Sequence, residues 1–174
     1  MRPNRKRNQN IECFDAYLDI ETTGLSFVSS DITVIGIYLC DGTESSVVQL
    51  YGRQVTAENL LRALKNVQKI YTYNGRRFDL PFINWFLGID LESNFKHEDL
   101  MYRCWECNLK GGLKAVERQL GIDRESRGVN GFYAVWLWNK YIEENDEDAL
   151  QQLLQYNRDD IVNLRALRNK LGIG

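Results

Sequence analysis

Apolar and β-branched residues gather in three short runs in the first third of the chain, a pattern typical of strands. The first run begins at Phe14 and ends in a Thr-Gly turn at residues 22–25, and two more occupy residues 31–40 and 45–51. The tight Asp41-Gly42 link between the last two predicts a β-hairpin. Because the first run is expected to pair antiparallel to the second, the three form a predicted meander.

The period of the apolar positions changes to that of a helix after residue 55. Thr56 is the predicted N-cap of a helix with its apolar side at Leu60, Leu61, Leu64 and Val67. A strand at residues 69–73, a helix at 78–87 and a short strand at 95–98 follow. Strands that alternate with helices indicate a parallel arrangement. The predicted fold class is therefore α/β, with a mixed β-sheet (antiparallel three-strand meander plus parallel strands) flanked by helices.

The chain is expected to be helical from Gly111 onward. Residues 132–142 carry five aromatic side chains, which favours a packed core helix over a base-stacking platform. In the last helix, Asp160 lies within about 60° of the centre of an apolar stripe, and Asp159 lies nearly opposite. The pattern predicts that Asp160 faces the protein, with Tyr156 one turn earlier on the same side, whereas Asp159 faces water.

Length and charge allow one domain with a short basic arm. The chain has 174 residues, enough to bury a core without disulfides or metal ions. Residues 1–10 carry +4, which leaves −6 for the rest of a chain whose net charge is −2. We expect residues 1–10 to be a disordered arm with weak phosphate contacts, and residues 11–174 to form the domain. No apolar segment suits a membrane anchor or a secretory signal, so a cytoplasmic location is expected.

Two carboxylates share one face of the first strand, because successive side chains of a strand alternate. Asp19 and Glu21 stand roughly 6.5 to 7 Å apart along it. In a half-buried setting they need a basic side chain, a shared proton or a metal ion; at a solvated strand end they need nothing. Asp79 precedes a helix, which suits an N-cap, although α/β folds also place their chemistry there. Asp160 also needs a partner, and the sequence offers no obvious cation beyond a Lys or Arg of the sheet layer.

The cysteines are weaker candidates for chemistry. Cys13 and Cys40 lie beside or within apolar runs, where a cysteine acts as a small hydrophobic residue. Cys104 and Cys107 form a lone C-x-x-C with His97 upstream. A second pair at metal-ligand spacing is missing, which argues against a zinc or redox site.

The segments that hold the acids resemble the three motifs of the DEDD family of 3'-5' exonucleases, which have the RNase H-like fold. Residues 19–25 are similar to the first motif, residues 73–82 to the second, and residues 156–160 to the third in its Tyr-x3-Asp form, as in the DEDDy group. The likeness spans residues 14 to about 168. It is greatest to compact bacterial and archaeal exonuclease-like domains of the RNase H-like superfamily, in which segments like residues 97–100 and the Gly-Leu-Lys-Ala-Val-Glu helix at residues 112–117 also occur. Polymerase proofreading domains share the motifs less closely.

This resemblance implies the chemistry and the site. Two divalent ions, Mg²⁺ or Mn²⁺, would support phosphodiester hydrolysis, and Tyr156 would orient the attacking water. The implied ligands of these ions are Asp19, Glu21, Asp79 and Asp160. The 3' end of DNA or RNA would lie against Thr22, Thr23, Gly24, Leu25, Asn74 and Phe78. No role is assigned to Arg76-Arg77. A structure-specific RNase H-like endonuclease and a non-catalytic nucleic-acid-binding module are the alternatives.

Overall fold

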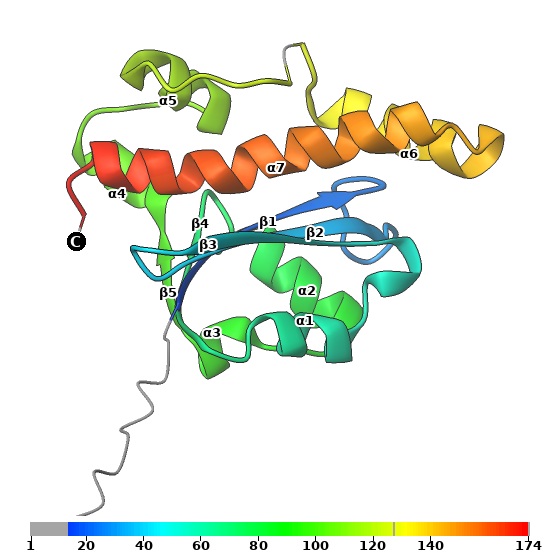
Figure 1. The fold of residues 1–174 in the computed structure, drawn as a ribbon, viewed down its shortest axis with the longest axis horizontal. Coiled ribbons are helices and arrows are strands. Elements are labelled where there is room, and N and C mark those ends of the chain that lie inside the picture. The colour runs from blue at the N-terminus through cyan, green and yellow to red at the C-terminus, as the bar shows by residue number, and fades with distance from the viewer. Residues whose placement is uncertain (1–13, 127, 174) are drawn as a thin grey trace, which may run out of the picture.

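A five-stranded mixed sheet forms the centre of the fold, with β1 (Phe14–Thr22) as its middle strand (Figure 1). On one side, β2 (Ile32–Cys40) and β3 (Ser45–Tyr51) continue the sheet in antiparallel fashion. On the other side, β4 (Val67–Thr72) and β5 (Lys96–Asp99) run parallel to β1. The strand order is β3-β2-β1-β4-β5. This arrangement confirms the predicted α/β class and the meander joined to parallel strands.

The computed structural model describes residues 14–126 and 128–173. The predicted basic arm and Cys13 lie outside these described residues. Within them, no helix has the length and apolar character that crossing a membrane requires.

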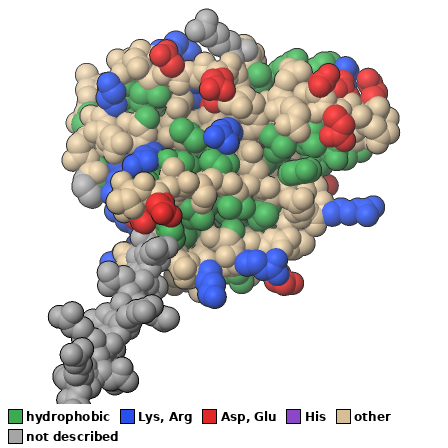
Figure 2. All heavy atoms as spheres, viewed as in Figure 1, with side chains coloured by type: hydrophobic (Ala, Val, Ile, Leu, Met, Phe, Trp, Pro, Cys, Tyr) green, Lys and Arg blue, Asp and Glu red, His purple; other side chains and the backbone are tan. Residues whose placement is uncertain are grey.

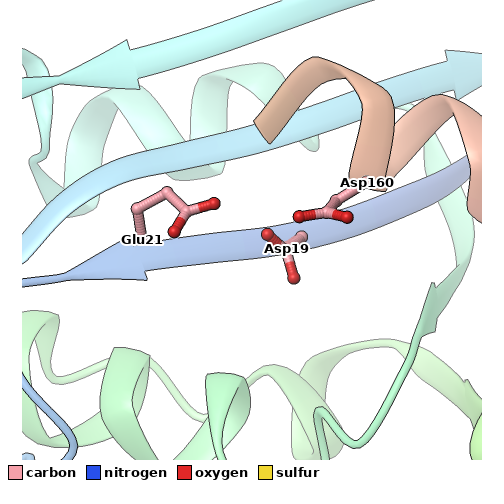
Figure 3. A group of neighbouring side chains, drawn as sticks. All are labelled: Asp19, Glu21 and Asp160. Atoms are coloured by element: carbon pink, nitrogen blue, oxygen red, sulfur yellow. The ribbon is translucent and has the colours of Figure 1, made fainter. Parts of the chain in front are cut away.

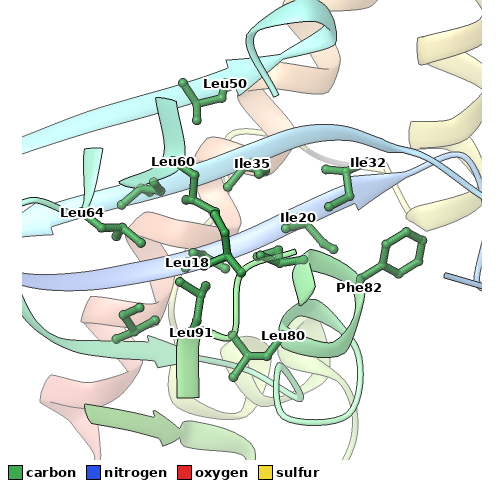
Figure 4. Close-up of a cluster of buried hydrophobic side chains, with 14 of the residues drawn as sticks. Leu18, Ile20, Ile32, Ile35, Leu50, Leu60, Leu64, Leu80, Phe82 and Leu91 are labelled. Atoms are coloured by element: carbon green, nitrogen blue, oxygen red, sulfur yellow. The ribbon is translucent and has the colours of Figure 1, made fainter. Parts of the chain in front are cut away.

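Three helices cover one face of the sheet and bury the larger apolar cluster (Figures 1 and 4). They are α1 (Ala57–Ala63), α2 (Asp79–Leu87) and α3 (Leu91–Asn94). Leu18 and Ile20 of β1 point into this cluster. Thr56 caps α1 as predicted, because its side chain accepts a hydrogen bond from the backbone N of Asn59 at 3.2 Å. A 3-10 turn (Gly52–Gln54) joins β3 to this layer.

The opposite face of the sheet is covered by the longest helix, α7 (Glu147–Lys170), which extends along it (Figure 1). The other helices of this layer are α4 (Leu100–Glu106), α5 (Leu113–Leu120) and α6 (Gly131–Glu144). Tyr17 of β1 packs here, in a cluster with Tyr71 and Leu164. The alternation predicted for β1 is therefore correct, and the side of Tyr17 is the side that faces α7.

The prediction of a packed core helix is wrong for most aromatic residues of α6. Phe132 is 87% exposed, Trp136 is 48% exposed and Tyr133 is 36% exposed. The buried residues of α6 are Ala134 and Leu137. Figure 2 shows hydrophobic side chains at the surface over the α6 end of the molecule. The helix packs against α7 and β1, and within the described residues no element covers Phe132, Tyr133 and Trp136.

The cysteine motif lies at the end of α4, a helix that the hydrophobic pattern did not predict. Cys104 is buried and Cys107 is exposed, and both are free thiols. His97 is bonded elsewhere: its Nε2 lies 2.9 Å from Oγ1 of Thr72, and its Nδ1 lies 3.3 Å from a carboxylate oxygen of Glu92. His97 is therefore held by residues near the sheet edge, Cys104 belongs to a buried apolar cluster, and Cys107 is exposed.

Candidate active site

Three carboxylates meet between β1 and α7. Asp19 and Glu21 extend from the same face of β1, and Asp160 reaches them from α7 (Figure 3). One carboxylate oxygen of each lies within 4.8 Å of those of the others. Asp160 is 6% exposed, so the prediction that it faces the protein body is confirmed.

These carboxylates are held in a poorly solvated environment. Burial raises the pKa of Asp19 and of Glu21 well above the ordinary value, and repulsion from Asp160 and Asp79 raises both further. The pKa of Asp160 is raised to about 6, mainly by burial, although Arg124 lowers it. Since like charges in a low dielectric repel, the cluster favours the binding of a cation.

The donor set suits a hard divalent cation. All three groups of the cluster offer carboxylate oxygens, and no sulfur or imidazole nitrogen is among them. Oxygen ligands suit Mg²⁺ and Mn²⁺, whereas zinc sites use sulfur and nitrogen donors more often. The residues present therefore fit the metal that the sequence resemblance implies.

Asp79 is close to this cluster but has a different anchor. It is the first residue of α2, and no side chain caps this helix at Phe78, so the N-cap interpretation is wrong. Instead, Oδ1 of Asp79 accepts a hydrogen bond from the backbone N of Ile20 at 3.0 Å. Burial raises the pKa of Asp79 to about 7, and the Ile20 hydrogen bond opposes this shift. Asp79 is thus fixed to the strand segment between Asp19 and Glu21.

Arg124 supplies a cation that the sequence did not reveal. Its Nη2 lies 2.6 Å from Oδ1 of Asp160, and its Nη1 lies 2.8 Å from both carboxylate oxygens of Glu117. The expectation that the acids have no obvious cation is therefore wrong. It failed because Arg124 belongs to the segment between α5 and α6, not to the sheet layer.

Asp159 does not face water as predicted. It is 7% exposed, and its Oδ2 accepts hydrogen bonds from the backbone N of Ser126 at 2.7 Å and from the Ser126 hydroxyl. Gln155 also donates to its other oxygen at 2.9 Å. The segment after α5 covers this side of α7, so the helix has a second buried face that a single apolar stripe does not indicate.

Tyr156 lies beside the acids under two cations. Its ring centroid is 4.2 Å from Nζ of Lys114 and 5.5 Å from Cζ of Arg124. Burial raises the pKa of Tyr156, and the charges of Asp160 and the other acids raise it further. The phenol therefore stays protonated at neutral pH and can donate a hydrogen bond, whereas it is a poor base.

Two cavities adjoin the acids. The first, of about 750 Å³, is lined by Asp19, Asp160 and Tyr156, and also by Asn74. The second, of about 970 Å³, is lined by Glu21 and by the remaining residues of the substrate set: Thr22, Thr23, Gly24, Leu25 and Phe78. Asn130 and Gly131, where α6 begins, line both cavities. Of the predicted substrate residues, Asn74 thus lines the first cavity and the other five line the second.

Several residues of the site were not among the predicted site residues. Lys114 and Arg124 contact the Tyr156 ring, and Asn157 donates a hydrogen bond to Asp19. Lys114 lies in the Gly-Leu-Lys-Ala-Val-Glu segment that the family resemblance includes, and this was a usable signal. Arg124 stands in a polar connection with no periodic pattern, so no local signal pointed to it. Of the basic pair, Arg76 is bonded to Glu92 at 3.0 Å.

Comparisons with known proteins agree with this fold. The family model described as the RNase H superfamily matches residues 16–172. An uncharacterized protein of Methanocaldococcus jannaschii is 29% identical over 161 residues, which cover 84% of this chain and 88% of that protein.

Two solved structures are similar at low sequence identity. The family B DNA polymerase of Pyrobaculum calidifontis matches with a TM-score of 0.69 and 18% identity over 91% of this chain. This chain spans 24% of that polymerase. A structure described as the apo form of a nuclease matches with a TM-score of 0.59 and 20% identity, over 90% of this chain and 70% of the other. At these identities the likeness shows the fold alone.

Proposed function

Since this chain belongs to the RNase H superfamily, we propose that it is a metal-dependent 3'-5' exonuclease of the DEDDy type that hydrolyses DNA or RNA. The observation that carries the proposal is the cluster of Asp19, Glu21 and Asp160, with ligand atoms within 4.8 Å of one another. Asp79, fixed to the same strand by Ile20, completes the set. When bound, two Mg²⁺ or Mn²⁺ ions would polarise the phosphodiester and lower the pKa of the attacking water.

The surrounding side chains orient the reactants. Tyr156 stays protonated, so it donates a hydrogen bond to the attacking water or to a phosphate oxygen rather than taking a proton. Lys114, over the Tyr156 ring, places a positive charge beside the acids where a phosphate would lie. Arg124 holds Asp160 in place through a buried ion pair.

The turn after β1 receives the terminal nucleotide. Thr22 stabilises this turn, because its hydroxyl donates to the backbone O of Gly24 at 2.6 Å. Leu25 follows with 82% of its surface exposed, within the cavity that Glu21 also lines. An exposed apolar side chain at this place can pack against a base of the 3' end.

Hydrolysis of labelled strands tests the proposal. Single strands labelled at the 3' or the 5' end are incubated with Mg²⁺ or Mn²⁺, and the products are sized. Mononucleotides released from the 3' end support it, whereas internal cuts indicate an endonuclease and an absence of products contradicts nuclease activity. Asp19→Ala is expected to abolish release. Asp148→Ala removes an exposed acid from the first turn of α7 and is expected to leave release unchanged.

One observation favours a non-catalytic nucleic-acid-binding module as the second candidate. Arg124 already pairs with Asp160, so part of the acidic charge is balanced without a metal. Calorimetric titration with Mn²⁺ separates the two candidates, because an exonuclease of this type binds divalent ions at the cluster and a binding module need not.

A further inference from the structure

Three residues stand in one row across the sheet beneath α7. Asp19 of β1 pairs with Gly36 of β2, and Gly36 pairs with Gln49 of β3. Paired residues of neighbouring strands point to the same face, so this row faces the helix. A Cβ atom on Gly36 would lie 2.1 Å from Oδ1 of Asn157. Asn157, a residue of α7 with no exposed surface, therefore occupies the gap that glycine leaves in the row.

The hydrogen bonds fix which way the Asn157 amide points. Nε2 of Gln49 lies 2.8 Å from the backbone O of Leu154, which can only accept, so this end of Gln49 is the NH₂ group. The same Nε2 lies 3.0 Å from Oδ1 of Asn157, which must then be the amide oxygen. Nδ2 of Asn157 is left to donate toward Asp19, at 3.2 Å from Oδ2 and 3.4 Å from the backbone O.

Asp19 and Asp160 differ in the side chain that donates a hydrogen bond to each carboxylate. Among the described residues, Asn157 is the side chain that donates a hydrogen bond to the Asp19 carboxylate. An amide is neutral, so it fixes one carboxylate oxygen without cancelling the negative charge, whereas Arg124 balances the charge of Asp160. Hydrogen-bond donors behind a metal ligand orient it and typically affect metal affinity by about 10- to 100-fold.

We propose that Asn157 is a positioning residue for Asp19, holding one carboxylate oxygen so that the other is presented to a divalent cation. Gln49 orients the amide, and Gly36 provides the space for it. The inference rests on the proposed function, because it requires the acidic cluster to bind a metal. It adds a chain of hydrogen bonds that runs from Gln49 of β3 through Asn157 of α7 to the ligand Asp19 of β1. The two amides of this relay, Gln49 and Asn157, are neutral.

Calorimetric titration of Mn²⁺ into the full chain tests this relay. Asn157→Ala is expected to weaken the affinity by about 10-fold or more with the number of bound ions unchanged, and the hydrolysis rate should recover at saturating Mn²⁺. Gln49→Ala, which keeps Asn157 in place, is expected to weaken it less. If Asn157→Ala fails to fold, Gln49→Ala decides. The control is Leu167→Ala, which shortens another buried side chain of α7, about two turns after Asp160, in the apolar cluster around Tyr71.

Each outcome distinguishes the relay from the proposed function. An unchanged Mn²⁺ affinity in the Asn157 or Gln49 variant overturns the relay. A purely structural role would lower only the folded fraction, and thus the apparent number of bound ions, without changing the affinity. An equal loss in Leu167→Ala also overturns it, since any disturbance of α7 would then suffice. A wild-type chain that binds no Mn²⁺ overturns the proposed function itself.

Discussion

Arg124 and Asp160 form a buried ion pair in which Nη2 lies 2.6 Å from Oδ1. The Arg124 side chain is 11% exposed and that of Asp160 is 9% exposed. The same guanidinium also bonds Glu117, whose side chain is 1% exposed. One cation thus balances two buried carboxylates from α5 and α7, and it joins the segment between α5 and α6 to the acidic cluster.

Arg124→Ala is therefore expected to destabilise the metal-free protein strongly. It leaves two carboxylates buried without a cation, which costs about 3 to 5 kcal/mol. In a domain of this size the melting temperature should decrease by about 6 to 20 °C. Thermal unfolding with a chelator measures this, and Mn²⁺ should restore more stability to the variant than to the wild type. The control is Arg103→Ala, whose ion pairs lie at the surface; equal decreases in both variants would contradict the prediction.

Glu21→Gln is expected to stabilise the metal-free protein. Glu21 is 8% exposed, and the charges of Asp160 and Asp79 repel it. Removal of its charge should raise the free energy of unfolding, while Mn²⁺ affinity falls by at least about 10-fold. Asp159→Asn is the matched control: it neutralises a buried acid that Ser126 and Gln155 already satisfy, so its stability should decrease. A less stable Glu21 variant would show that repulsion is not the dominant effect.

Gly36→Ala is expected to separate α7 from the sheet. The added Cβ would meet the Asn157 amide at 2.1 Å, and this amide is fully buried and hydrogen-bonded to both Gln49 and Asp19. Overpacking of this kind costs about 1 to 3 kcal/mol, and Mn²⁺ affinity should fall because the ligands on β1 and α7 move apart. Gly131→Ala provides the comparison, since a Cβ there meets nothing within 4 Å and the helix should gain slightly. Chemical denaturation of both variants gives the two free energies.

The sequence predicted what local periodicity determines. Strand runs separated by a tight turn predicted the meander, and the apolar stripe of the last helix correctly turned Asp160 inward. Both features depend on neighbours within a few residues or on one dominant face. The alternation in β1 likewise placed Asp19 and Glu21 on one face, and the structure shows that this face meets α7.

Local sequence patterns did not predict contacts between segments that are distant in the chain. A helical wheel gives the apolar face of α7 but not the segment that covers its other side, so Asp159 was placed in water although Ser126 binds it. Asp79 has the sequence position of an N-cap, yet its carboxylate is taken by Ile20, 59 residues earlier. The aromatic residues of α6 are apolar, but their burial depends on a partner element that the described structure does not place over them.

The metal-free protein is expected to become more stable as the pH falls from about 7.5 to about 5.5. Burial raises the pKa of Asp79 to about 7 and that of Asp160 to about 6, above the ordinary value of about 3.9. Folding therefore takes up protons in this range, and the free energy of unfolding decreases as the pH rises through about 4 to 7. With a chelator, the melting temperature should be at least about 3 °C higher at the lower pH.

Two comparisons isolate the share of the acidic cluster in this pH dependence. Burial lowers the pKa of His97, so this residue makes the protein less stable as the pH falls. Its effect is the same in wild type and in Glu21→Gln, so a flatter plot of melting temperature against pH in the variant reports the acidic cluster alone. Saturating Mn²⁺ should reverse the wild-type trend, because protons then compete with the ion for the carboxylates. The prediction is contradicted if, with the chelator, the melting temperatures of wild type and Glu21→Gln both fall with the same slope as the pH is lowered. The carboxylates would then be ionised in the metal-free protein.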